Sequence, residues 1–476
     1  MALLLAASYI CVASTYYVDP VNGNDAGSGT QLSPWRTIQK SMNAATPGST
    51  VNIKAGTYHE RLALNVSGTA ANAPGTAGNY ITFQPAGYTG LASDGAACGA
   101  SISANGYKTC VGARVILDYT YLGTVTNDST PFLNINNKSY VKIQGLTFQN
   151  YTCNGSFKQG VRIDGGSHDI QLLNNRFLHN KNIHGNIDGT SALLHIRLWS
   201  SNNVTFRGNE IGDFEGSMGE AFTMDTGCTN ALVESNYLHD VSGIGIDLHG
   251  GAHNATIRGN LLEYISIRRD GTVWYNNPSN SIYVDGGNTS TIERNLVRNS
   301  GYGITVLAEP GQPAAHHITV RDNVAYSNGQ AGIMVGTWYS NTDGSRVYNI
   351  SVLNNTLYNN KYGFLIRPYT SASVSWKNNI LSSNTYNYAN GLGWPVGTIK
   401  YNLYFGSNVG PDANKVTANP QFTAPGASPP DLRIQATSPA KNAGHPNFVP
   451  GAGETDFLGH NRVVGGRVDI GAYEIQ

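Results

Sequence analysis

Residues 170–177 read IQLLNNRF, in which alternating apolar residues are followed by an Asn and a further apolar position. The same pattern returns seven times, as VTFRGNEI, ALVESNYL, ATIRGNLL, STIERNLV, ITVRDNVA, ISVLNNTL and VSWKNNIL. The Asn that the copies share falls at Asn175, Asn209, Asn236, Asn260, Asn295, Asn323, Asn355 and Asn379. The return of one pattern over much of the chain indicates a repeat fold.

A second motif, a Gly followed by alternating apolar residues, recurs between the Asn positions. Examples are GVRIDGG at 160–166, GIGIDLHGG at 243–251 and SIYVDGG at 281–287. Each repeat therefore holds at least two short strands. The shortest repeat, from Asn236 to Asn260, spans 24 residues and leaves no room for a helical crossover on every turn. The pattern predicts an all-β parallel solenoid in which the Asn side chains bond to the coils above and below.

The flanks of the chain lack the repeat. Residues 35–45 have helical periodicity after Pro34 and would cover the open N-terminal end of the solenoid. The Pro- and Gly-rich C-terminal part predicts an irregular cap. We expect an N-terminal cap with the first coils over 15–130, the parallel solenoid with a catalytic wall over 131–410, and a C-terminal cap over 411–476.

The first fourteen residues, MALLLAASYICVAS, predict a secretory signal peptide over 1–14, because an apolar stretch precedes a small-residue cleavage zone. We therefore expect a secreted, extracellular protein. Four cysteines would remain, and Cys98 and Cys110 are the favoured disulfide pair because they share one Gly-rich loop.

The composition disfavours several classes of partner. The 476 residues carry 30 basic and 30 acidic side chains, and charged residues make up only 13% of the chain. This balance disfavours a nucleic-acid binder or a protein of anionic membrane surfaces. Since no apolar run is long enough to span a bilayer, we expect no membrane segment, and a solenoid needs no partner chain, so we expect a monomer.

Both ends of the chain resemble a known family. The segments YYVDPVNGNDAGSGT at 16–30 and PWRTIQKSMNAATPGSTVNIKAGTYHE at 34–60, with SPAKNAG at 438–444 and VDIGAYE at 468–474, are similar to secreted right-handed parallel β-helix proteins of the pectate-lyase-like type. These are carbohydrate-active proteins that include lyases and glycosidases. The resemblance implies a right-handed parallel β-helix with an N-terminal helical cap, an irregular C-terminal cap and a carbohydrate partner.

A narrower resemblance lies in GEAFTMD, GIGIDLHGG, SIYVDGG and GITVLAE, at 219–225, 243–251, 281–287 and 303–309. Their order resembles β-helix glycoside hydrolases of the β-xylosidase type, in which an Asp and a Glu about one coil apart serve as nucleophile and acid/base. The matching positions are Asp285 and Glu309.

The strand alternation also places these acids together from the residues alone. If Ile246, Leu248, Ile282 and Val284 point inward, their neighbours point outward, and coils stack about 4.8 Å apart. One outer wall would then carry Arg197, Trp199, Asp225, Asp247, His249, Tyr283, Asp285 and Glu309, with Glu220 at a strand start, Arg367 three coils further on, and Trp274 and Trp338 in flanking loops. Aromatic faces beside hydrogen-bonding acids suit sugar rings.

The favoured hypothesis for this wall is glycoside hydrolysis on a plant or microbial polysaccharide or oligosaccharide. It needs two carboxyls, one charged and one protonated. We predict Asp285 as nucleophile and Glu309 as acid/base, with Asp247 as a third catalytic carboxyl that tunes the pair. The substrate would be bound by Arg197, Trp199, Glu220, Asp225, His249, Trp274, Tyr283, Trp338 and Arg367. No cofactor is required under this hypothesis.

Two other hypotheses stay open. In a calcium-dependent lyase of a uronic-acid polymer, Asp225, Asp247 and Asp285 would bind Ca²⁺ and a Lys or Arg would act as base. No Lys falls on the wall near the acids, which favours hydrolysis. A non-catalytic glycan-binding solenoid is the third hypothesis. Asp-Gly-Gly is also a turn signature, so Asp285 could instead cap a turn.

Overall fold

The structure is a computed structural model. It describes residues 14–71, 78–88, 115–126, 128–155, 158–183, 193–216, 219–274, 278–336, 347–367, 373–390 and 397–476. The predicted signal peptide, the predicted Cys98–Cys110 pair and Trp338 lie outside these ranges. Cys153 and Cys228 are buried free thiols. The described part of the chain has no helix that is long and apolar enough to cross a membrane.

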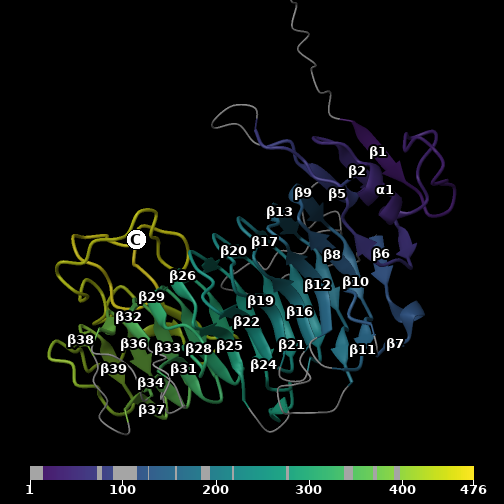
Figure 1. The fold of residues 1–476 in the computed structure, drawn as a ribbon. Coiled ribbons are helices and arrows are strands. Elements are labelled where there is room, and N and C mark those ends of the chain that lie inside the picture. The colour runs from purple at the N-terminus through teal and green to yellow at the C-terminus, as the bar shows by residue number, and fades with distance from the viewer. Residues whose placement is uncertain are drawn as a thin grey trace, which may run out of the picture.

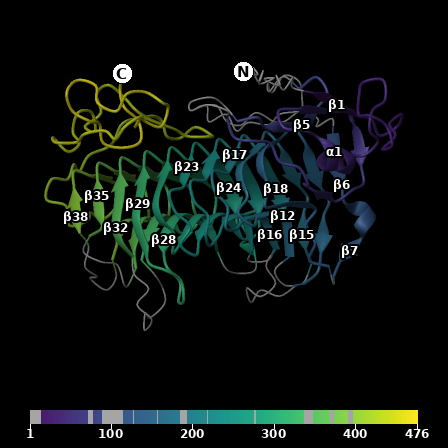
Figure 2. The same ribbon diagram turned by 45° about the horizontal axis from the view of Figure 1, so that its top comes forward.

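Three long parallel sheets run along the molecule, and successive turns of the chain add strands to each of them in order (Figure 1). Turned by 45°, the same sheets appear as a continuous stack of coils (Figure 2). The described residues form 13, 12 and 11 strands in these sheets, which we call sheets I, II and III.

The strands of sheet I are β1 (Thr15–Val18), β2 (Thr50–Ile53), β5 (Ile81–Pro85), β9 (Ser139–Gln144), β13 (His168–Leu173), β17 (Thr205–Arg207), β20 (Leu232–Glu234), β23 (Thr256–Arg258), β26 (Asn288–Glu293), β29 (Ala315–Arg321), β32 (Val347–Leu353), β35 (Ser375–Lys377) and β38 (Thr398–Lys400). The strands of sheet II are β3 (Gly56–Tyr58), β6 (Val115–Asp118), β10 (Thr147–Gln149), β14 (Arg176–Leu178), β18 (Glu210–Phe214), β21 (Tyr237–Val241), β24 (Leu261–Ile265), β27 (Leu296–Arg298), β30 (Val324–Tyr326), β33 (Thr356–Tyr358), β36 (Ile380–Ser382) and β39 (Leu403–Phe405).

The strands of sheet III are β4 (Leu62–Ala63), β8 (Leu133–Asn136), β12 (Lys158–Asp164), β16 (Leu193–Leu198), β19 (Glu220–Met224), β22 (Ile244–His249), β25 (Asn280–Asp285), β28 (Tyr302–Leu307), β31 (Ala331–Val335), β34 (Tyr362–Ile366) and β37 (Tyr386–Ala389). The remaining elements are α1 (Ile38–Ala44), the 3-10 turn η2 (Thr120–Leu122), the short parallel strands β7 (Thr124–Val125), β11 (Thr152–Cys153) and β15 (Lys181–Asn182), and the antiparallel pair β40 (Phe422–Ala424) and β41 (Asp431–Ile434).

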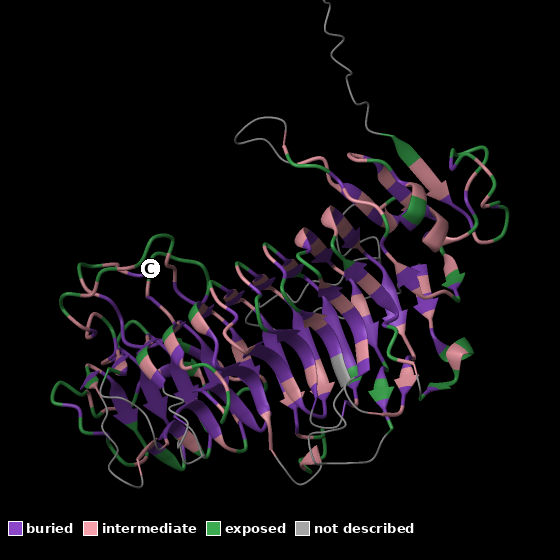
Figure 3. Ribbon diagram, in the orientation of Figure 1, coloured by how far each residue is buried: buried purple, intermediate pink, exposed green. Residues whose placement is uncertain are grey.

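The core is a column of apolar side chains inside the coils. In sheet III, Ile246 pairs with Ile282, which pairs with Ile304, and all three are fully buried. Buried residues line the strands along the whole solenoid (Figure 3). Burial of this column removes apolar surface from water on every coil. The inward residues assumed from the sequence alternation are therefore correct.

The Asn column is continuous, as predicted. From Asn175 onward, each Asn Nδ2 donates to Oδ1 of the Asn one coil later, over 2.9–3.2 Å. Each also donates to a backbone carbonyl of the preceding coils, for example Asn260 to Val233 at 3.0 Å. The column extends one coil further than the repeats indicated, to Asn402, which donates to Asp412 Oδ2 at 2.9 Å. An acceptor-only carboxylate thus ends the chain of amides.

A helix covers the N-terminal end of the solenoid, whereas the C-terminal segment packs along its side. Helix α1 is capped by Thr37, whose side chain accepts from the Lys40 backbone N–H at 3.0 Å, and it packs against β4 and β1. It begins at Ile38, three residues later than the periodicity suggested, because Trp35 pairs with β1 instead. The C-terminal segment runs back beside the solenoid (Figure 1).

Buried charges help to fix the C-terminal cap on the solenoid. Arg462 is 1% exposed, and its Nε lies 3.4 Å from Asp322 Oδ1 at the end of β29. Its Nη1 lies 3.7 Å from Glu474 Oε2. Removing one partner of such a buried pair leaves an uncompensated charge, so the pair favours one docked position of the cap.

Candidate active site

One outward face of sheet III carries a cluster of acids that we call the acid wall: Glu220, Asp225, Asp247, Asp285 and Glu309. Asp247 on β22 pairs with Thr223 on β19 and with Tyr283 on β25. His249 pairs with Asp285 in the next row. Glu309 lies two residues beyond the end of β28. The parallel register therefore brings acids from four successive coils together, because residues in one row are one strand spacing apart.

Asp225 is the acid that is held in its charged form. Its Oδ2 accepts from Arg197 Nε at 2.9 Å and Nη2 at 2.5 Å, and its Oδ1 accepts from His249 Nδ1 at 2.9 Å. Burial raises the pKa of Asp225, but these bonds and one from the Thr226 N–H at 2.6 Å hold it well below its usual value. Since its oxygens are occupied by cations, Asp225 positions His249 and Arg197.

Asp247 and Glu220 have the opposite environment. Asp247 is 2% exposed, and neither its Oδ1 nor Glu220 Oε2 has a hydrogen-bond partner among the described residues. Burial, with the charges of Glu220, Asp285 and Glu309, raises the pKa of Asp247 well above its usual value. Burial likewise raises the pKa of Glu220 to about 7. Two neighbouring carboxyls out of water cannot both ionise at low cost, so at least one proton stays on this pair.

Asp285 and Glu309 are joined through the backbone and through a tyrosine. Asp285 Oδ1 accepts from the Glu309 backbone N–H at 2.6 Å, and Tyr283 donates its phenol proton to Glu309 Oε1 at 2.6 Å. Burial and the charge of Glu309 raise the pKa of Asp285 to about 7, although the backbone bond opposes this. His249 Nε2 lies 3.7 Å from Asp285 Oδ2, so the imidazole lies between the carboxyls of Asp225 and Asp285.

His249 itself is favoured as a cation. Burial lowers the pKa of its ring, but the hydrogen bond to Asp225 and the charges of Asp225, Asp285 and Glu220 raise it overall. A positive imidazole next to the acid wall offsets part of the repulsion among the carboxyls.

The other predicted binding residues are spread more widely. Trp199 is 43% exposed, and Arg197 Cζ lies 4.5 Å from its ring centre, so an aromatic face is available beside the wall. Trp274 lies in the loop after β24, where Arg268 Cζ is 3.8 Å from its ring. Arg367 follows β34, three coils beyond Asp285, and interacts with Tyr302. Trp199 and Arg197 therefore belong to the wall, whereas Arg367 lies along the sheet from it.

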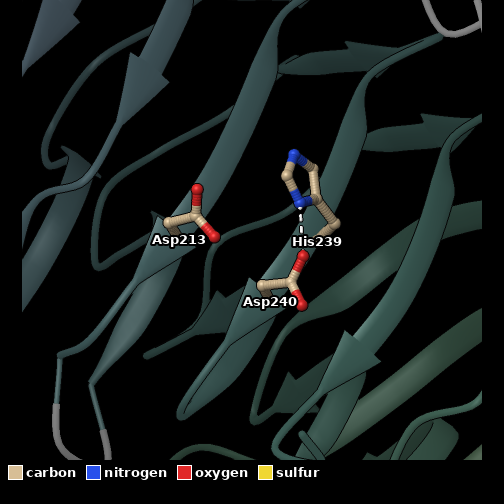
Figure 4. Close-up of side chains that lie close together, drawn as sticks. All are labelled: Asp213, His239 and Asp240. Atoms are coloured by element: carbon tan, nitrogen blue, oxygen red, sulfur yellow. Dashed lines mark hydrogen bonds and ion pairs between the residues drawn. The ribbon is translucent and has the colours of Figure 1, made fainter. Parts of the chain in front are cut away.

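A possible metal group occurs elsewhere, on sheet II. Asp213 on β18 and His239 and Asp240 on β21 are the described residues whose ligand atoms come within 4.8 Å of one another (Figure 4). His239 bonds to Asp240 at 2.7 Å and Glu210 at 3.2 Å. Burial lowers the pKa of its ring, but these bonds raise it to about 9. Without a metal this group is an ion-pair network, and a metal would have to displace the proton of the His239 ring in order to bind.

The calcium hypothesis used a different set, Asp225, Asp247 and Asp285. Among the described residues these carboxyls do not form a group with three ligand atoms in mutual range. Calcium binding at the acid wall stays a prediction.

Sequence reasoning did not find the second polar cluster at Glu210, Asp213, His239 and Asp240. Asp213 and Asp240 have left-handed backbone, with φ of 50° and 53°, at one corner of neighbouring coils. The signal was present in the sequence as an Asp four positions after two successive residues of the Asn column, Asn209 and Asn236. It was obscured because corner positions of this kind are usually turn residues.

Residues 123–308 match the family model described as "Right handed beta helix region", and residues 21–65 match one described as "Protein of unknown function (DUF1565)". The first match confirms the predicted right-handed parallel β-helix. A curated relative is the "Uncharacterized protein YwoF" of Bacillus subtilis (strain 168), which is 27% identical over 381 residues, 77% of this chain and 73% of that protein.

Similar solved structures include two enzymes of carbohydrate chemistry. Pectate lyase Pel9A has a TM-score of 0.49 and 14% identity, over 98% of this chain and 97% of that chain. The GH136 lacto-N-biosidase from Eubacterium ramulus has a TM-score of 0.48 and 14% identity, over 85% of this chain and 67% of that chain. The reaction of the present chain has to be argued from its own residues.

Proposed function

We propose that this protein is an extracellular glycoside hydrolase whose active site is the acid wall. The observation that carries the proposal is the contrast in surroundings among carboxyls on neighbouring strands: Arg197 and His249 bind Asp225, whereas Asp247 and Asp285 are buried beside other acids. Hydrogen bonds hold the pKa of Asp225 well below its usual value, whereas burial raises the pKa of Asp285 and Glu220 to about 7 and that of Asp247 well above its usual value. Glycoside hydrolysis needs one carboxyl that holds a proton and one that carries a charge, on either side of one bond.

The hydrogen bonds favour the reverse of the roles assigned from the sequence. Asp285, with a pKa of about 7, is suited to keep a proton and donate it to the leaving oxygen of the glycosidic bond. Glu309 is only half-buried and accepts a hydrogen bond from Tyr283, so its carboxylate is placed to attack the anomeric carbon or to take a proton from the attacking water. Asp225 and His249 then act on Asp285 as positioning residues.

The basic groups near the wall are poorly suited to β-elimination. A lyase needs a side chain that removes the proton next to the uronate carboxylate. Arg197 is committed to Asp225 through two hydrogen bonds, and Tyr283 gives its proton to Glu309 rather than taking one. Burial and the charges of Glu309 and Asp285 raise the pKa of Tyr283 well above its usual value, which makes the phenolate costly.

The test is product analysis on a panel of plant and bacterial polysaccharides, with and without a chelator. Reducing ends and the ultraviolet absorbance of unsaturated uronates are followed in parallel. The proposal expects reducing ends without that absorbance, insensitive to the chelator, and abolished in Asp285→Asn and in Glu309→Gln. Chelator-sensitive absorbance would make the protein a lyase. Products that both variants still form would place the chemistry away from the acid wall.

A further inference from the structure

A hollow lies on sheet II, away from the acid wall on sheet III. It has a volume of about 460 Å³. One side is formed by the corner of the solenoid with Tyr264, Tyr326 and Tyr358, and the other by the cap segment Pro425–Pro430. We call this hollow the cap groove. It is built from two parts of the chain that are far apart in sequence, because the C-terminal cap docks on the solenoid there.

The floor of the cap groove is a ladder of side chains with one rung per coil. Glu263 pairs with Arg298, Arg298 with Tyr326, and Tyr326 with Tyr358. The residues that follow these four are therefore also aligned, and all have left-handed backbone, with φ of 51–56°: Tyr264, Asn299, Ser327 and Asn359. An aromatic ring, two amides and a hydroxyl thus face the groove at steps of about 4.8 Å.

The charges in the cap groove are already compensated. Arg298 Nε donates to Glu263 Oε2 at 2.7 Å, and Arg298 Nη1 donates to Tyr326 Oη at 2.9 Å. Arg269 Nη2 donates to Asp240 Oδ2 at 2.6 Å while its Cζ stacks 4.5 Å from the Tyr264 ring centre. A polyanion would find no uncompensated positive charge among these residues, and an apolar ligand would strand their polar groups.

We propose that the cap groove binds a linear, uncharged glycan chain that lies parallel to the solenoid axis. The half-buried ring of Tyr264 suits the C–H face of a pyranose ring, and the side-chain amides and hydroxyl of Asn299, Asn359 and Ser327 suit sugar hydroxyls. The coil step of about 4.8 Å is close to the advance of one ring in an extended glycan, so successive sugars meet successive rungs. This site holds the polymer, takes no part in bond cleavage and does not rest on the acid wall.

The test uses the full chain with Asp285→Asn as background, so that no bound glycan is turned over. A glycan array that carries neutral and uronate-containing chains identifies the ligand class, and calorimetry with the best neutral hexasaccharide gives the affinity. We expect binding to linear neutral chains, with affinity reduced about tenfold by Tyr264→Ala, the loss of one stacked ring. Tyr121→Ala, which removes an exposed tyrosine at the N-terminal end, should leave the affinity unchanged.

Asn359→Gly is the second groove variant, because glycine accepts the left-handed backbone at this position. It removes one exposed hydrogen-bonding rung without touching the packing of Tyr358 on Phe422, so it tests the ladder even if an aromatic variant folds poorly. The proposal is overturned if no glycan on the array binds. It is equally overturned if Tyr264→Ala and Asn359→Gly bind as tightly as the background, or if acidic chains bind best with an affinity that falls with salt.

Discussion

Replacing Asp285 with Asn should change how the stability of the protein depends on pH. The pKa of Asp285 is raised from 3.8 to about 7 by burial and by the charge of Glu309. The unfolded carboxyl therefore loses its proton at lower pH than the folded one. Its contribution to stability is fully present below about pH 3.8 and is lost as the pH rises to about 7. Between about pH 5 and about pH 8 the loss amounts to about 2–3 kcal/mol.

The Asn amide is neutral at every pH and can still accept from the Glu309 N–H, so Asp285→Asn should escape this loss. Urea unfolding followed by fluorescence and circular dichroism, at about pH 5 and about pH 8, should show the variant gaining about 2–3 kcal/mol on wild type across the window. Asp118→Asn is the control. Partial burial raises the pKa of Asp118, but bonds from Thr120 and Gln149 lower it to about 2, so its effect should be the same at both pH values. Parallel behaviour of Asp285→Asn and wild type would mean that Asp285 is ionised throughout, and the proton assignment would fail.

Two further predictions concern the solenoid. Asn260→Ala removes a side chain that donates to Val233 and Asn295 and accepts twice from Asn236. Each buried group left without its partner costs about 1–3 kcal/mol, so urea unfolding should show that the free energy of unfolding falls by several kcal/mol. Asn447→Ala, at an exposed position, should change it by almost nothing. Burial raises the pKa of the Cys153 thiol to about 12, so this thiol should resist alkylation in the native protein and react after denaturation. Mass spectrometry of the alkylated protein measures both. Rapid labelling of Cys153 in the native protein would contradict its buried position.

Much of the fold could be predicted because the same pattern of residues recurs in successive coils of the repeat. Each position of the Asn column needs a side chain that both donates and accepts a hydrogen bond, and the eight Asn positions could be recognised for that reason. The extension to Asn402 and Asp412 was missed because the copy around Asn402, TIKYNLYF, lacks the alternation that marks the others. The packing of the cap on the solenoid was also missed, since the ion pair between Arg462 and Asp322 joins residues 140 positions apart.

The members of the acid wall followed from strand alternation and register, both of which are local properties of the sequence. Their protonation did not, because it depends on burial and on partners from other coils. Asp225 and Asp285 look alike in sequence, each before a turn. Only their contacts in three dimensions distinguish the two acids. Asp225 accepts hydrogen bonds from Arg197 and His249, whereas Asp285 accepts one from the backbone N–H of Glu309 and lies close to the carboxylate of that residue.

The most direct test of the hydrolase account compares two leaving groups. On the natural glycan the leaving oxygen needs a proton from Asp285, whereas an aryl glycoside of the same sugar has a leaving group that departs without one. Rates for both substrates are measured with wild type, Asp285→Asn and Glu309→Gln. The account predicts that Asp285→Asn loses activity on the natural glycan but keeps most of it on the aryl glycoside, and that Glu309→Gln loses both. Equal loss on both substrates in Asp285→Asn would contradict its role as the proton donor.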